Sequence, residues 1–342
     1  MNGDRWVTIF LFIAALLVLA GLVWIAGVEE TLAALGRARL PLVAIVVGLA
    51  VLWLASWGMS LYVVLGALGA PISPVKAVLV FSAAMFSNNI TPFGQAGGEP
   101  VSAILISEAA DSEYETGLAA IASVDTLHFL PSIATALTGV ALLTLRATAI
   151  SRDLYLSIAV FAGLFVVVAV AAVLIYRYRR GIEHFIVAIT TPIVNSISRL
   201  IPGRSPPGSD AVEHRIDGFF EAIERIATDR RALLEATLFS TLGWFILAIT
   251  LWVSVSAVGA SVPLGAVLIT VPVGSIAGAT PFPGGSGPIE AAFAAILVSL
   301  GGILNSTAVA AVLVYRLATY WLATVVGGLV AAGLGASRVR GG

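Results

Sequence analysis

The sequence predicts an all-α polytopic membrane protein, and three observations lead to that prediction. Of its 342 residues, 59% are hydrophobic and only 11% are charged, whereas soluble domains are about a quarter charged. Several apolar runs reach the roughly 20 residues that a helix needs to cross a bilayer. The strands of a transmembrane barrel are about ten residues long and alternate in polarity, which this sequence does not do. We therefore expect membrane-spanning helices throughout the chain.

About six full spans and two broken helices are expected, arranged as two repeats. The first repeat, residues 1–146, contains spans at 6–28, 40–65 and 117–145 and a broken element at 74–107. The second repeat, residues 154–333, contains spans at 154–176, 233–258 and 306–333 and a broken element at 263–300. A polar insert occupies 177–231, where Ile216, Phe219, Phe220, Ile223 and Ile226 follow helical spacing. That spacing predicts an amphipathic helix along the membrane face.

The stretch 91–100 interrupts an apolar region with helix-breaking residues and one carboxylate, and it reads TPFGQAGGEP. Proline removes a backbone donor and glycine opens conformations closed to other residues, so a membrane helix is expected to break here. Broken backbone at membrane depth persists only where protein or a water-filled cavity satisfies its polar groups. Such a break indicates a transport site, above all when the second half of the chain repeats it.

A second stretch, 280–290, repeats the pattern and reads TPFPGGSGPIE. When Pro74 is aligned with Pro263, the two Thr-Pro-Phe sequences coincide without a gap and Gly98 falls on Gly287. Chance is the alternative, because alanine, valine and glycine coincide often in membrane proteins. A shared Thr-Pro-Phe at a fixed distance from a shared proline favours an internal duplication.

Arginines predict how the loops lie relative to the membrane. They flank the insert at 177–231 and follow the last span. The positive-inside rule then places both regions, and by counting spans both termini, on the cytoplasmic side. This holds if each broken element re-enters and leaves the membrane on one side, which we prefer to full crossing. The two repeats then have opposite orientations, and a binding site is expected between them near the midplane.

Two carboxylates, Glu99 and Glu290, each follow a glycine turn at the start of a helical arm. One interpretation is structural: a carboxylate in the first turn of a helix caps free amides and is stabilised by the helix dipole. The functional interpretation is that the paired turns direct backbone amides toward one cavity and form an anion site for phosphate. Glu99 and Glu290 would then bind a cation or a proton that moves with the substrate.

Three further ionisable residues lie within predicted spans, where such residues are functional candidates by default. Asp125 and His128 are three residues apart and share a helix face. Arg316 has a near-equivalent place in the second repeat, so an Asp125–Arg316 ion pair is one expectation. The other is that Arg316 binds a phosphate bidentately, with Tyr315 and Tyr320 nearby. His128 is either a proton relay or a polar residue bonded to a neighbouring helix.

The predicted substrate-binding residues are those of the two turns and their surroundings. They are Asn88, Thr91, Gly97, Gly98, Glu99, Thr280, Gly284, Gly285, Glu290, Tyr315, Arg316 and Tyr320, with Asp125 and His128 as a coupling or charge network. The sequence contains no Walker motif, no His-Glu-x-x-His, no Gly-x-Ser-x-Gly and no cysteine. We therefore expect no catalytic residue, no metal and no cofactor, and the chain is not expected to be an enzyme.

The two glycine-rich motifs resemble those of the lysylphosphatidylglycerol synthase transmembrane, flippase-like family. The resemblance rests on 94–100 (GQAGGEP), 103–107 (AILIS), 283–292 (PGGSGPIEAA), 315–316 (YR) and 320–321 (YW), and it covers nearly the whole chain. It implies movement between leaflets of a lipid such as aminoacylated phosphatidylglycerol or a polyprenyl-phosphate sugar. The soluble aminoacyl-transferase domain of the family is missing, so no lipid lysylation is expected. The family's acid-Arg pair is also altered, because Thr126 follows Asp125.

Three functions remain open at this stage. The first is a flippase that moves an anionic or phosphate-bearing lipid, either a phospholipid or a polyprenyl-phosphate sugar, across the cell membrane. The second is an ion-coupled transporter of a small solute, and the third is a non-transporting scaffold for lipid or glycan synthesis. The expected partners are a membrane lipid and either a second copy of the chain or lipid- or glycan-synthesis enzymes, with no nucleic acid.

Overall fold

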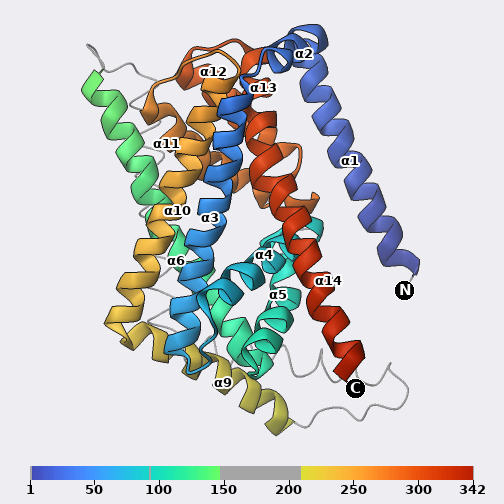
Figure 1. Ribbon diagram of the computed structural model, residues 1–342, viewed down its shortest axis with the longest axis vertical. Helices are drawn as coiled ribbons and strands as arrows, with labels where there is room; N and C mark the ends of the chain where they lie inside the picture. The colour runs from blue at the N-terminus through green and yellow to red at the C-terminus, as the bar shows by residue number, and fades with distance from the viewer. Residues whose placement is uncertain (1, 92–93, 147–208, 342) are drawn as a thin grey trace.

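The computed structural model describes residues 2–91, 94–146 and 209–341, and all regular structure in these ranges is helical (Figure 1). The longer helices are α1 (Asn2–Ala26), α2 (Val28–Gly36), α3 (Leu40–Ala67), α4 (Pro74–Ile90), α5 (Gln95–Ala110), α6 (Tyr114–Arg146), α9 (Ser209–Thr228), α10 (Arg230–Ala257), α11 (Leu264–Ser275), α12 (Pro288–Gly301), α13 (Asn305–Arg316) and α14 (Ala323–Gly341). Two short 3-10 turns, η1 (Ile276–Gly278) and η2 (Pro283–Gly285), connect α11 to α12, and a π-helical segment, η3 (Leu317–Leu322), joins α13 to α14.

The predicted all-helical membrane class is confirmed. Within the described residues, five helices are long and apolar enough to cross a membrane, and a sixth is added if the bent pair α1–α2 counts as one span. One of the five, Pro283–Gly301, belongs to the second broken element. The predicted span at 154–176 and the first part of the insert, 177–208, lie outside the described residues.

The first predicted span, 6–28, corresponds to α1, which ends at Ala26. We expected one run over 6–28, but the chain turns at Gly27 and α2 leaves α1 at an angle of 91°. Gly27 has a φ of 92°, a conformation that glycine adopts without the steric cost of a side chain. The apolar run ends at Val28, before Glu29 and Glu30, so the end of the span was predicted to within two residues, but the short helix α2 was not predicted.

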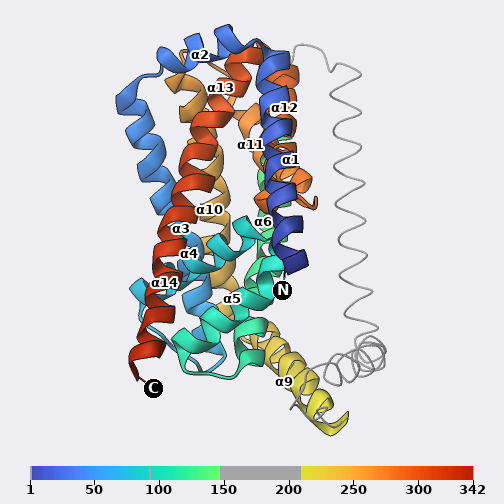
Figure 2. The same cartoon turned by 90° about the vertical axis from the view of Figure 1, so that its right-hand side faces the viewer.

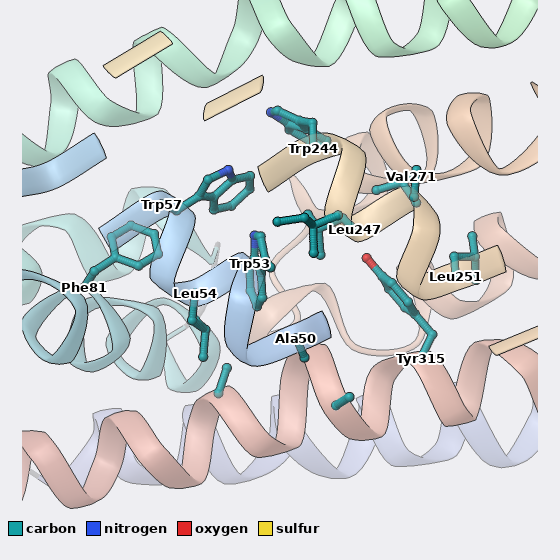
Figure 3. Close-up of a cluster of buried hydrophobic side chains, with 14 of the residues drawn as sticks. Ala50, Trp53, Leu54, Trp57, Phe81, Trp244, Leu247, Leu251, Val271 and Tyr315 are labelled. Atoms are coloured by element: carbon teal, nitrogen blue, oxygen red, sulfur yellow. The ribbon is translucent and has the colours of Figure 1, made fainter. Parts of the chain in front are cut away.

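The centre of the bundle is the contact between α3 and α10, which lie along each other. Hydroxyl and indole groups of α3 donate to carbonyls of α10: Ser56 Oγ to Phe239 O at 2.7 Å, and Trp57 Nε1 to Ser240 O at 3.3 Å. Gly243 of α10 leaves room for the Trp57 ring. Figure 3 shows Trp53 and Trp57 of α3 beside Trp244, Leu247 and Leu251 of α10 in one apolar cluster.

The two broken elements enter the bundle from opposite ends (Figures 1 and 2). The α4–α5 pair enters from the end where α9 and the C-terminus lie and returns to it. The α11–α12 pair enters from the end where α2 and the start of α13 lie and returns there. Their packing is reciprocal: α4 packs against α14, whereas α11 packs against α6. Two repeats of opposite orientation would produce this arrangement, although the repeat itself stays a prediction.

Glycines allow these reciprocal contacts to be close. Where α6 crosses α11, a Cβ added to Gly139 would lie 2.7 Å from the carbonyl oxygen of Gly265. Where α14 crosses α4, a Cβ added to Gly327 would collide with the backbone carbonyl of Ser82. Small residues serve this purpose generally in membrane helix packing, since they let backbones approach closely.

Helix α9 is the described part of the polar insert, and it lies across one end of the bundle (Figure 1). Ile226 is buried, and Phe219 and Ile223 pack against the core formed with α3, α6 and α10. The charged residues Glu221 and Glu224 on the same helix are exposed. This is the amphipathic arrangement that the apolar spacing of 216–226 predicts.

Candidate functional site

The first broken element bends because α4 ends directly before a glycine-rich turn. The Thr91 hydroxyl donates to Ser87 O at 2.8 Å, and the backbone N–H of Thr91 bonds the same carbonyl. Gly94 then adopts a φ of 55° and begins α5. Gly98 of α5 lies against α4 so closely that a Cβ would be 2.7 Å from both the N and the Cα of Asn88. This contact holds the two arms of the element together.

The second broken element contains three glycines with positive φ near its tip. They are Gly284 at 54°, Gly285 at 64° and Gly287 at 94°. Gly287 precedes α12, and its N–H donates to Glu290 Oε2 at 2.6 Å. The capping role that we considered for Glu290 is therefore present, because this bond satisfies one of the free amides at the helix start.

The tips of the two broken elements meet inside the bundle. A Cβ on Gly94 would lie 3.7 Å from the carbonyl oxygen of Gly278, and one on Gly284 would lie 3.1 Å from Asn89 Cα. Helix α1 also reaches the second tip, where Ala15 and Val18 contact Gly287. The two turns singled out from the sequence are thus brought together, although they are almost 190 residues apart in the chain.

Arg316 lies at this meeting point and pairs with Glu290. The distance from Arg316 Nε to Glu290 Oε1 is 2.6 Å, and the side chains are 11% and 6% exposed. Arg316 also donates from a terminal nitrogen to Gly284 O at 3.2 Å, and its guanidinium lies 4.4 Å from the centre of the Tyr320 ring. The guanidinium is held by a carboxylate, a carbonyl of the turn and an aromatic face.

The expectation of an Asp125–Arg316 pair is therefore wrong. Arg316 forms its ion pair with Glu290 of α12, in the same half of the chain, and Asp125 is hydrogen-bonded to Glu99. The spacing argument compared distances along the chain, and it did not anticipate that each span would pair with the neighbouring arm.

Tyr320 connects the second half to the first tip. Its hydroxyl donates to Asn89 O at 3.2 Å, while Asn89 Nδ2 donates to Thr324 Oγ1 at 2.8 Å. Tyr320 lies in the π-helical segment, four residues after Arg316, and the Arg316 guanidinium lies over its ring. Asn89 and Thr324 were not predicted. Asn89 stands beside Asn88 directly before the turn, which is a weak signal, and nothing in the sequence singles out Thr324.

Replacing Tyr320 with phenylalanine should reduce stability modestly. The ring that supports Arg316 would remain, but the bond to Asn89 O would be lost, at a cost of about 0.5–1.5 kcal/mol. Denaturant-induced unfolding of the purified protein measures this change. Tyr62→Phe is a suitable comparison, because Tyr62 of α3 is also a tyrosine and is partly buried. An equal effect of the two substitutions would contradict a specific role for the Tyr320 hydroxyl.

His128 lies apart from the two tips, in the aromatic cluster between α3, α6 and α10. Its ring stacks on Trp57 with centroids 4.0 Å apart, and Nδ1 is 2.6 Å from Ser240 Oγ. The Trp244 indole donates to the His128 carbonyl at 3.0 Å. These contacts match the alternative of a polar residue bonded to a neighbouring helix.

Tyr315 also points away from Arg316. It is 4% exposed, its ring lies 5.5 Å from that of Phe293, and Figure 3 shows it within the apolar cluster near Leu251 and Val271. Neighbouring helix positions face different directions, so a residue next to Arg316 in sequence need not share its site. Tyr315 is part of the core.

The remaining predicted residues lie in the two turns. Gly97 is partly buried, and Gly285 packs on Gly278 and Ile289. Two polar atoms near the tips have no hydrogen-bond partner within the described residues, namely Asn88 Oδ1 and Thr280 Oγ1. Buried polar atoms are normally paired, so these two are exceptions, and Asn88 Oδ1 lies against Gly98 between α4 and α5.

Comparison with known proteins agrees with the resemblance of the two motifs. The family model for the lysylphosphatidylglycerol synthase TM region matches residues 12–327. A UPF0104 membrane protein of Pyrococcus horikoshii is 23% identical over 315 residues, which are 90% of this chain and 92% of the relative. A UPF0104 membrane protein of Methanothermobacter thermautotrophicus is 27% identical over 287 residues, 82% of this chain and 79% of the relative. With the match extending over most of its length, this chain belongs to the family of the lysylphosphatidylglycerol synthase TM region.

Proposed function

We propose that this chain moves an anionic or phosphate-bearing lipid between the two leaflets of the cell membrane, with Arg316 as the main contact for the headgroup. The observation that supports this most directly is the position of Arg316 where two broken helices from opposite ends of the bundle meet. A guanidinium is a permanent cation whose planar donors match phosphate oxygens. Family membership agrees with a role in lipid handling.

The donors around Arg316 fit a headgroup of this kind. A guanidinium has five N–H donors, and the bonds to Glu290 and Gly284 use two of them. Asn88 Oδ1 and Thr280 Oγ1 add polar atoms without partners among the described residues. These groups favour a phosphate that also bears hydroxyl or amine groups over a simple apolar ligand.

The flank of the second tip supports lateral access for a lipid. Ser275, Ala279 and Pro281 are exposed although they lie between apolar helices, and Ile276 is 56% exposed. Irregular backbone at membrane depth is tolerated where it borders water or protein, so we propose that water reaches this exposed turn. In this proposal the headgroup enters beside the turn while the acyl or prenyl chains remain in the bilayer.

The proposal includes an inverted repeat whose two tips form the site. Reciprocal packing of α4 on α14 and of α11 on α6 supports it. The end of the bundle that contains α9 and the C-terminus would face the cytoplasm, in keeping with the arginines around it. The chain would perform no covalent chemistry, and lipid- or glycan-synthesis enzymes that supply or consume the lipid are its expected partners.

The test is reconstitution of the full chain into phosphatidylcholine vesicles with a trace of fluorescent phosphatidylglycerol. A membrane-impermeant reductant should quench the probe that starts in the inner leaflet only when the protein is present, because the protein moves that probe to the outer leaflet. Arg316→Lys should retain part of this activity, since a point charge cannot reproduce the guanidinium fork. Fluorescent phosphatidylcholine is the headgroup control, and a polyprenyl-phosphate probe distinguishes the two lipid classes.

Other outcomes would favour the alternatives. Protein-dependent uptake of a small phosphate solute without lipid movement would favour an ion-coupled solute transporter. If the protein moves none of the tested lipids and takes up no solute, the result would favour a scaffold. The buried Arg316–Glu290 pair argues against a scaffold, because a charge at membrane depth is costly and a scaffold does not need one.

A further inference from the structure

The carboxylate of Glu290 accepts a hydrogen bond from the Arg316 guanidinium, which is the group that we propose binds the anionic headgroup. Its Oε1 accepts from Arg316 Nε at 2.6 Å, whereas its Oε2 accepts from the N–H of Gly287 at 2.6 Å. The carboxylate is thus divided between two donors, and it contacts the guanidinium through one oxygen. A phosphate can contact the guanidinium through two oxygens, which is the stronger geometry.

Both members of the pair keep other partners if the pair opens. Glu290 retains the Gly287 N–H at the start of α12, where the helix dipole also stabilises a carboxylate. Arg316 retains Gly284 O and the face of Tyr320. Opening an isolated buried pair would strand two charges, but here neither charge loses all its contacts.

We propose that Glu290 is an internal competitor for the anion site: it closes on Arg316 when no lipid is bound, and the headgroup displaces it. This inference rests on the proposed function, and it assigns Glu290 the role of a residue that sets affinity and release. The Gly287 bond positions the carboxylate, so that Glu290 stays close enough to reclaim Arg316 when the headgroup leaves.

With competition of this kind, the apparent affinity is proportional to the fraction of time for which Arg316 is free to bind the lipid. If Arg316 is available for about a tenth of the time, the apparent affinity for an anionic lipid falls about tenfold. Removing the competing charge should therefore tighten binding. It should also slow release, since no carboxylate replaces the departing headgroup.

The experiment compares Glu290→Gln with wild type in the purified full chain. Glutamine keeps an acceptor for the Gly287 N–H but loses the charge that competes for Arg316. Binding of phosphatidylglycerol in mixed micelles, followed by the rise in thermal unfolding midpoint, should become about tenfold tighter, with little change for phosphatidylcholine. In vesicles, Glu290→Gln should move phosphatidylglycerol more slowly at saturating lipid. Glu235→Gln, which removes the carboxylate of the exposed pair with Arg231, is the matched control and should change neither quantity.

Equal or weaker phosphatidylglycerol binding by Glu290→Gln would overturn the competitor role. Glu290→Asp serves if the glutamine variant does not fold. A shorter carboxylate that stays bonded to the Gly287 N–H at the start of α12 falls short of Arg316, so this variant should also bind the lipid more tightly than wild type. The proposed function fails separately, if wild type moves no phosphatidylglycerol in vesicles. Since binding is measured without transport, the two failures are distinguishable.

Discussion

Replacing Arg316 with alanine is expected to lower the free energy of unfolding by about 3–5 kcal/mol, the usual cost of removing one member of a buried ion pair. The reason is that Glu290, with a side chain only 6% exposed, would keep its charge with a single hydrogen bond from Gly287. Denaturant-induced unfolding in detergent measures the loss. The same variant should abolish phosphatidylglycerol movement in vesicles.

A second substitution separates the two effects. In the Arg316→Ala background, Glu290→Gln should recover most of the lost stability, because the stranded charge is gone, but it should not restore lipid movement. Asp125→Asn in that background should recover nothing, since Asp125 pairs with Glu99. Arg231→Ala, which breaks an exposed pair, is the control and should cost about 0–1 kcal/mol. A stable and fully active Arg316→Ala protein would contradict both the pairing and the anion role.

Replacing Gly98 with alanine should have the second largest effect, a loss of about 1–3 kcal/mol from overpacking. The added Cβ would lie 2.7 Å from the N and Cα of Asn88, and backbone atoms cannot rotate away as a side chain can. The arms α4 and α5 would have to separate, which would displace the adjacent Glu99 and the tip at Gly94. Lipid movement should fall more than stability.

Gly48→Ala is the matched control, because a Cβ on Gly48 of α3 would meet nothing within 4 Å. Both variants replace a glycine with an alanine within a helix, so the change in backbone entropy on unfolding is similar in the two proteins. Unfolding and vesicle assays on both proteins separate crowding at the first broken element from the general effect of alanine. Similar losses from the two substitutions would show that the Gly98 contact has no special importance.

Local features of the sequence were sufficient to predict the membrane class and the two breaks. An apolar run of span length predicts a membrane helix from its composition alone. The Thr-Pro-Phe and glycine motifs predict a break because they restrict or free the backbone of a few neighbouring residues. The sequence did not predict the short helix α2 after Gly27, because the polar residues Glu29 and Glu30 indicate only that the apolar run ends. The π-helical segment after Arg316 was missed too, since its letters, LATYWL, suit an ordinary helix.

The charges at membrane depth could be found from the sequence, but their partners could not. Glu99, Asp125, Glu290 and Arg316 stand out because ionisable residues in apolar spans are rare. Spacing along the chain suggested an Asp125–Arg316 pair, whereas the structure pairs Arg316 with Glu290 and Asp125 with Glu99. His128 was selected as an ionisable residue within a span and Tyr315 as the neighbour of Arg316, and both belong to the aromatic and apolar core.

By itself, the sequence determined that this is a helical membrane protein with two glycine-rich breaks, because those properties depend on composition and on residues close together in the chain. The motif repeat also predicted that the two turns approach each other, but only the tertiary structure decided that Glu290 caps α12 while it binds Arg316, and that Asn89 bonds Tyr320 and Thr324. These contacts join residues as many as 235 positions apart. They depend on how α4 packs against α14 and on which way each side chain faces, and neither is encoded in local spacing.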